Sequence, residues 1–153
     1  MSTSIVLPIK TQILDLLNAR VELVPEILRV IHRPPITLDM ETVVFPVAFT
    51  VDGDEGGSEF RNRLRVGNFP YQVIICCDQK QEDVSRLMDR MQADLFELLI
   101  SSPSDEMRKF NCIIKEGGTP IDKQYYDEFR SGAVLNYTVE YRTDINSLYS
   151  KTY

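Results

Sequence analysis

The chain has 153 residues, 43% of them hydrophobic and 26% charged, with a formal net charge of −6 at pH 7. These values are typical of one ordinary globular domain and argue against a nucleic-acid coat or a polybasic membrane binder. No apolar run reaches the roughly 20 residues of a membrane span, and the start lacks the pattern of a secretion signal, so we expect neither.

Three cysteines, Cys76, Cys77 and Cys112, leave an odd number for disulfide pairing. Cys76 and Cys77 are adjacent in a predicted strand, where neighbouring side chains point to opposite faces. This spacing also does not suit a zinc site, which uses ligands separated by two or more residues. We therefore expect reduced, packed thiols, which fits a cytoplasmic origin.

The first predicted element is a helix over residues 9–21. Pro8 suits the first helical position, and Pro25 ends any continuation. Residues 27–31 form a short apolar run, either a strand or a single helical turn, of which we favour the strand. The helix prediction rests on apolar residues that share one face: Ile9, Ile13, Leu16, Leu17 and Val21.

Residues 43–77 predict one long β-hairpin with a mobile tip. Its first strand, over 43–51, contains Pro46, which cannot donate to a ladder, so we expect an edge strand or a bulge there. The segment 52–59 predicts a flexible acidic loop because it is rich in glycine and carboxylates. The carboxylates are Asp52, Asp54, Glu55 and Glu59.

A second helix is predicted over residues 81–101, because its apolar side chains share one stripe and must cover a sheet. Alternation predicts strands over 109–115 and 133–141, whereas 121–132 is expected to be a loop or short helix and 143–153 a loosely held tail. The chain thus predicts a single α+β domain over residues 1–153, with a mostly antiparallel sheet of four to five strands, a long hairpin and two packing helices.

Catalytic and metal sites find little support in the sequence. His32 is the only histidine, and it lies beside a proline-rich connector rather than near a nucleophile. A calcium loop starting at Asp52 would place Gly56 and Arg63 where carboxylates are required. We therefore expect no enzyme activity, no metal and no cofactor.

The arginines Arg61, Arg63 and Arg65 are the sharpest surface feature. Alternation in a strand would place all three guanidinium groups on one face. They either form a solvated face that balances nearby carboxylates, or bind an acidic partner or a neighbouring copy of the chain.

The order of elements, the segment VVFPVAF at 43–49 before an acidic loop, and the final strand LNYTVEYRTD at 135–144 resemble the tail terminator (tail completion) proteins of long-tailed bacteriophages. The resemblance covers nearly the whole chain and rests on pattern and order rather than on an invariant motif.

The resemblance implies a structural virion protein at the head-proximal end of the tail, assembled in the host cytoplasm. Such proteins form a hexameric ring that ends tail-tube polymerisation, joins the head connector and lets DNA pass without specific binding. Arg61, Arg63, Arg65 and Pro46 are then candidates for contacts with the next subunit or the tail tube. The alternatives are another head–tail neck protein, or a small α+β binding or regulatory domain, including an enzyme subunit with a shared site.

Overall fold

The computed structural model describes residues 7–33, 43–61, 64–78, 84–101, 105–110, 112–117, 130–144 and 147–151. Its helical elements are α1 (Ile9–Val21), α2 (Val84–Phe96), a π-helical turn (Glu97–Ser101) and α3 (Asp105–Lys109). Its strands are β1 (Arg29–His32), β2 (Val47–Asp52), β3 (Gly56–Arg61), β4 (Leu64–Asp78), β5 (Ile113–Glu116), β6 (Arg130–Asp144) and β7 (Ser147–Lys151).

The described strands form one sheet in the order β1-β2-β4-β6-β5, with β3 added to β4 and β7 added to β6. Only β1 and β2 run parallel, and the other described pairs are antiparallel. The predicted α+β class with a mostly antiparallel sheet is confirmed. The described residues contain seven strands rather than four or five, because the short strands β3 and β7 join the ends of long ones.

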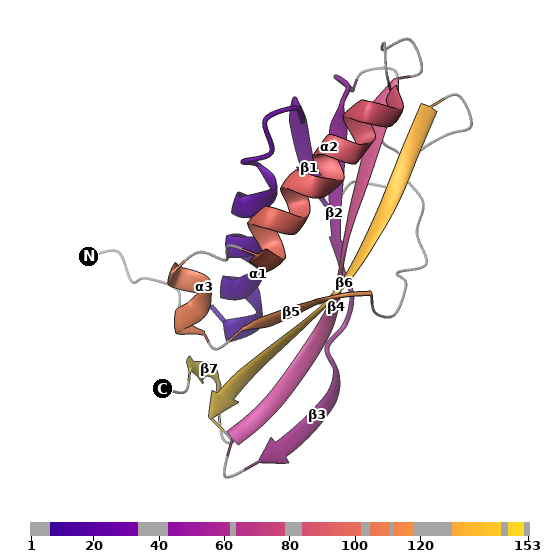
Figure 1. Ribbon diagram of the computed structural model, residues 1–153. Helices are drawn as coiled ribbons and strands as arrows, with labels where there is room; N and C mark the ends of the chain where they lie inside the picture. Colours follow the sequence, from indigo (N-terminus) through magenta and orange to yellow (C-terminus); the bar gives the residue numbers. More distant parts are fainter. Residues whose placement is uncertain are drawn as a thin grey trace.

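Helices α1 and α2 lie on the same side of the sheet (Figure 1) and contribute to one apolar core. The predicted stripe of α2 is confirmed, since Met88, Met91 and Leu95 are buried there and the stripe continues to Leu99 in the π-helical turn. At that turn the Leu98 carbonyl accepts a 3.1 Å hydrogen bond from Arg20 Nε, so the ends of the two helices are tied together.

The central strand β4 is buried on both faces. Cys77 packs beneath the helices, whereas Cys76 packs on the opposite face with Val47 and Phe49. The two thiols thus point to opposite faces as predicted, and all three cysteines are free. Because both faces are buried, the sequence of β4 near its C-terminal end is a continuous run of apolar residues.

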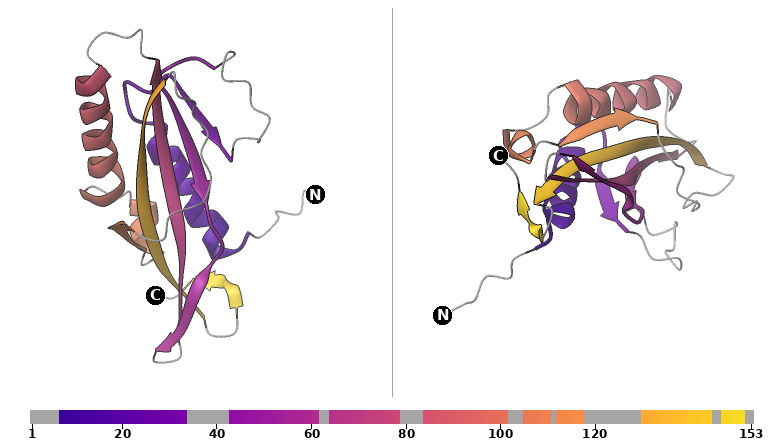
Figure 2. Two further views of the ribbon diagram at one scale, coloured as in Figure 1. Left: turned by 90° about the vertical axis from the view of Figure 1, so that its right-hand side faces the viewer. Right: turned by 90° about the horizontal axis from the view of Figure 1, so that it is seen from below.

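Strands β2 and β3 pair in succession with β4, which confirms the long hairpin. The loop predicted over 52–59 is wrong in extent, because Asp52 ends β2 and β3 already begins at Gly56. Residues 56–61 form a strand because β4 extends alongside them and supplies backbone hydrogen-bond partners. Figures 1 and 2 show β3 and the adjoining part of β4 extending beyond both helices.

Pro46 does not mark an edge strand. It precedes β2, which lies between β1 and β4, and its carbonyl accepts a 2.9 Å hydrogen bond from the Leu28 amide. The Phe45–Pro46 peptide bond is cis. The strand preferred over 27–31 is confirmed as β1, which is the edge strand on this side of the described sheet.

The C-terminal segment differs from the loose tail predicted over 143–153. Strand β6 continues to Asp144, and β7 turns back to pair with it, matching Lys151 to Thr143. The strand predicted over 109–115 begins only at Ile113, because α3 and a turn at Phe110 precede it. Most of the predicted loop or helix over 121–132 lies outside the described residues.

Candidate assembly surfaces

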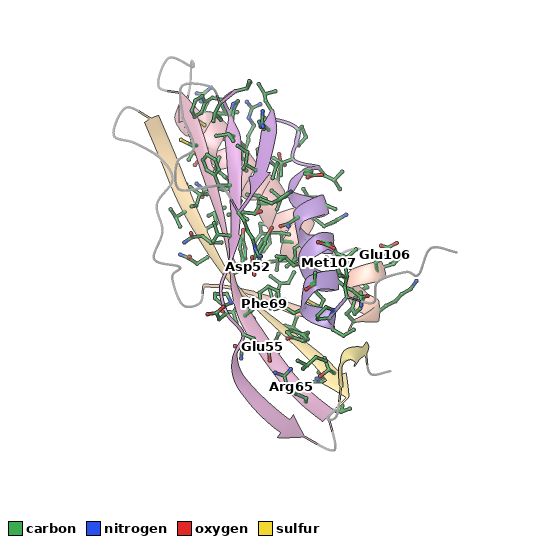
Figure 3. All side chains as sticks on the ribbon, turned by 180° about the vertical axis from the view of Figure 1, so that it is seen from behind. Asp52, Glu55, Arg65, Phe69, Glu106 and Met107 are labelled. Atoms are coloured by element: carbon green, nitrogen blue, oxygen red, sulfur yellow. The ribbon has the colours of Figure 1, made fainter. Side chains whose placement is uncertain are left out.

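The place where β2 passes into β3, which we call the hairpin base, contains the predicted loop carboxylates Asp52, Asp54 and Glu55, of which Asp52 and Glu55 form ion pairs. The Glu55 carboxylate accepts hydrogen bonds from the Arg65 guanidinium and from the Tyr141 hydroxyl. Figure 3 shows Glu55 and Arg65 close together beside β4. A Cβ at Gly67 would lie 2.8 Å from Glu55 Oε1, so glycine leaves the room that this carboxylate occupies.

Asp52 is the second anchor of the hairpin base, with only 3% of its side chain exposed. Arg33 donates to it through Nε and Nη2, both at 2.7 Å, and Lys10 Nζ lies 3.4 Å away. Burial acts to raise the pKa of Asp52, but the hydrogen bonds and charges of Arg33 and Lys10 outweigh it and hold that pKa below its ordinary value. Lys10 also donates to the Gly53 carbonyl at 2.9 Å.

The three arginines do not share one strand as predicted. Arg61 lies in β3 opposite Leu64, and Arg65 lies in β4 opposite Phe60, because the hairpin reverses between them. Arg63 lies outside the described residues. The spacing argument for a single row of guanidinium groups is therefore wrong, and Arg65 forms an ion pair within its own chain.

The four loop carboxylates also separate. Asp52 and Glu55 are partly buried in ion pairs, whereas Asp54 between them is exposed. Glu59 lies in β3, and its side chain is outside the described part of the structure. The sequence did not indicate Lys10, Arg33 or Tyr141 as partners, because their contacts join residues 19 to 86 positions apart.

Exposed apolar side chains lie near both edges of the sheet. Val44 is 53% exposed before β2, and Leu28 is 64% exposed just before β1. At the opposite edge, Ile113 in β5 is 44% exposed. Among the described strands, none pairs with the outer edge of β1 or β5. Pro46, the predicted interface residue, is buried within the chain.

His32, the only histidine, contacts a hydroxyl and a carboxylate. The ring nitrogens of His32 contact Thr50 Oγ1 at 2.5 Å and Glu22 Oε1 at 2.9 Å. Cys112 belongs to the edge of the apolar core, and burial raises its thiol pKa to about 12. Within the described ranges, no group of three or more His, Cys, Asp or Glu side chains is placed to hold a metal ion.

Comparison of the chain with protein-family models and with curated proteins gives no match to either. None of the helices in the described part of the chain has the length and apolar character needed to cross a membrane.

Proposed function

We propose that this protein is a non-catalytic structural component of a virion that caps the tail tube of a long-tailed bacteriophage as a hexameric ring. In this role it ends tube polymerisation and offers a surface to the head connector. The proposal rests on the sequence resemblance and on a fold of the class that the resemblance implies.

The observation that carries the proposal is the projecting β3–β4 hairpin on a sheet whose outer strands are unpaired among the described residues. A closed ring needs a heterologous interface, in which one surface meets a different surface of the next copy. Two different surfaces of this kind lie at opposite edges of the described sheet. One is the region around β1, with the exposed side chains of Leu28 and Val44, and the other is the β5 edge, with Ile113.

The expected partners are further copies of this chain, the tail tube protein and the head connector or neck protein. DNA would pass through the ring channel without specific binding. A net charge of −6 per chain supports this part of the proposal, because retention of nucleic acid depends on Lys and Arg contacts to phosphates.

Mass measurement over rising protein concentration, followed by negative-stain imaging, tests ring formation. We expect a concentration-dependent shift to a ring of uniform size, and shorter tail tubes when the protein is added to polymerising tube protein. A monomer at every concentration, with no effect on tube length, would contradict the proposal and favour a small α+β binding domain.

Arginine variants test which part of the hairpin contacts a partner. Changing Arg61 and Arg63 to Ala should weaken ring formation or tube capping while leaving the free energy of unfolding nearly unchanged. Arg65→Ala is the matched comparison, and it should lower the free energy of unfolding because Arg65 pairs with Glu55. Loss of DNA binding with intact assembly in the Arg61 and Arg63 variant would contradict the assignment.

A further inference from the structure

A polar cavity of about 280 Å³ lies between α1 and the sheet, beside the apolar core. Helix α1 contributes Thr11, Asp15 and Asn18 to its wall, strands β1 and β4 contribute His32 and Tyr71, and Arg33 follows directly after β1. The cavity exists because the face of β2 that meets α1 changes from Ala48 in the core to polar residues further along the strand. At roughly 30 Å³ per water in the liquid, the volume holds about nine waters or one small ligand.

The floor of the cavity is held by internal hydrogen bonds. Tyr71 donates through its hydroxyl to Asn18 Oδ1 at 2.8 Å, and Thr50 Oγ1 contacts His32 Nδ1 at 2.5 Å. His32 Nε2 is in turn 2.9 Å from Glu22 Oε1. These contacts join α1, β1, β2 and β4, so the polar groups around the cavity are fixed before any ligand arrives, which lowers the cost of binding.

The charges around the cavity favour a cation. Asp52 is already compensated by Arg33 and Lys10, and Arg33 turns its Nε and Nη2 donors toward that carboxylate. Asp15 is exposed at the wall and has no ion pair among the described residues. With Glu22 close by, carboxylates outnumber cations around the cavity, so an anionic ligand would meet net repulsion.

The backbone conformation of Arg33 also indicates that its part of the cavity wall is held rigidly. Arg33 adopts a φ of 49°, in the left-handed region that non-glycine residues rarely occupy. Its amide donates to the Thr50 carbonyl at 2.8 Å, and its guanidinium is held by Asp52. Such backbone conformations persist where the surrounding contacts over-determine them, and they concentrate at ligand sites.

We propose that this cavity binds a small ligand through a protonated amine, with Asp15 as the charged partner and the hydroxyl of Thr11 as a further acceptor. The site borders the β1 region proposed for ring assembly through His32, but its amine-binding residues Thr11 and Asp15 lie on α1. Its chemistry is that of a primary ammonium group on a short aliphatic chain, which matches the cavity in charge and size.

Titration of the full chain with putrescine, butane-1,4-diol and succinate, followed by backbone amide NMR, tests the site. These probes share one carbon skeleton length and differ in charge. Up to about 10 mM, a range suited to weakly binding small ligands, putrescine should give saturable shifts at residues 11–18 and 32–33. The diol and succinate should not. Equal binding of either control, or no saturable shift with putrescine, would overturn the proposal.

Two variants separate a built site from general attraction to an acidic surface. Asp15→Asn should weaken putrescine binding about 3–10-fold, as expected for a partly exposed ion pair. Thr11→Leu, which fills the cavity without changing charge, should weaken it as well. Asp89→Asn removes an exposed carboxylate on α2 and should leave binding unchanged. Equal weakening by Asp15→Asn and Asp89→Asn would show non-specific attraction only.

Discussion

The half of β4 beneath the helices and the half that enters the hairpin are stabilised by different interactions. Beneath α1 and α2, residues such as Val73 and Leu95 are fully buried in a continuous apolar core. At the hairpin base, the carboxylates of Asp52 and Glu55 bind basic and hydroxyl groups from distant segments. The apolar core should therefore depend little on pH and salt, whereas the hairpin base should depend on both.

This difference bears on the proposed assembly. The hairpin projects beyond the helices, and the ion pairs of Asp52 and Glu55 lie at its base, so we expect these charged contacts to help fix its orientation. Variants that weaken one region while sparing the other will show whether the two regions unfold as one unit.

The largest effect is expected for Leu95→Ala. Leu95 is fully buried, and truncation of such a leucine lowers the free energy of unfolding by about 2–5 kcal/mol. Asp89→Ala on the exposed side of the same helix should change it by about 0.5 kcal/mol or less. Urea unfolding of both variants measures this difference, and similar losses would mean that the buried face of α2 is wrongly assigned.

A smaller loss is expected for Asp52→Asn, about 1–3 kcal/mol, the range for hydrogen bonds to charged groups. Because the pKa of Asp52 is lowered in the folded protein, its contribution is present above the unfolded pKa near 3.9 and is lost as pH falls through the folded pKa. Unfolding measured from pH 7 downward should show the variant and the parent converging. A constant difference at all pH values would exclude the ion pair as the cause.

Glu55→Gln should lower the free energy of unfolding by about 1–2 kcal/mol, because it removes the charge that Arg65 contacts. The neighbouring exposed Asp54 supplies the control, since Asp54→Asn should stay within about 0.5 kcal/mol of the parent. Added salt should reduce the parent's advantage over the Glu55 variant. Hydrogen exchange at β3 amides should become faster in this variant, while amides beneath the helices should keep their protection.

The smallest effect, with the opposite sign, is expected for Asp94→Asn. Partial burial and the nearby Glu26 carboxyl raise the pKa of Asp94, so its ionised form opposes folding. Stability from this group is greatest below its unfolded pKa and falls as pH rises through the folded pKa. At pH 7 the variant should be equal to or more stable than the parent by up to about 0.5 kcal/mol, with Asp89→Asn as the control. A clear loss of stability would mean that the Glu26 contact is favourable.

Local pattern in the sequence was sufficient for much of the fold. The stripe containing Met91 and Leu95 predicted α2, and alternation predicted β4 and β6, because side-chain periodicity reports directly which face is buried. The long hairpin followed from two alternating runs separated by glycine-rich chain. These features depend on residues within a few positions of one another, so no knowledge of distant partners was needed.

The tertiary structure decided the remainder, since it depends on partners far away in the sequence. The sequence alone predicts a solvated loop over segment 52–59. In the structure Gly56–Arg61 pairs with β4, and Arg33 and Arg65 form ion pairs with Asp52 and Glu55. The row of arginines failed because the chain reverses between Arg61 and Leu64. Likewise, the sequence shows Asp15 only as a polar residue on the solvent side of a helix. It becomes part of a cavity wall because α1 packs against the part of β1 and β2 whose facing side chains are polar.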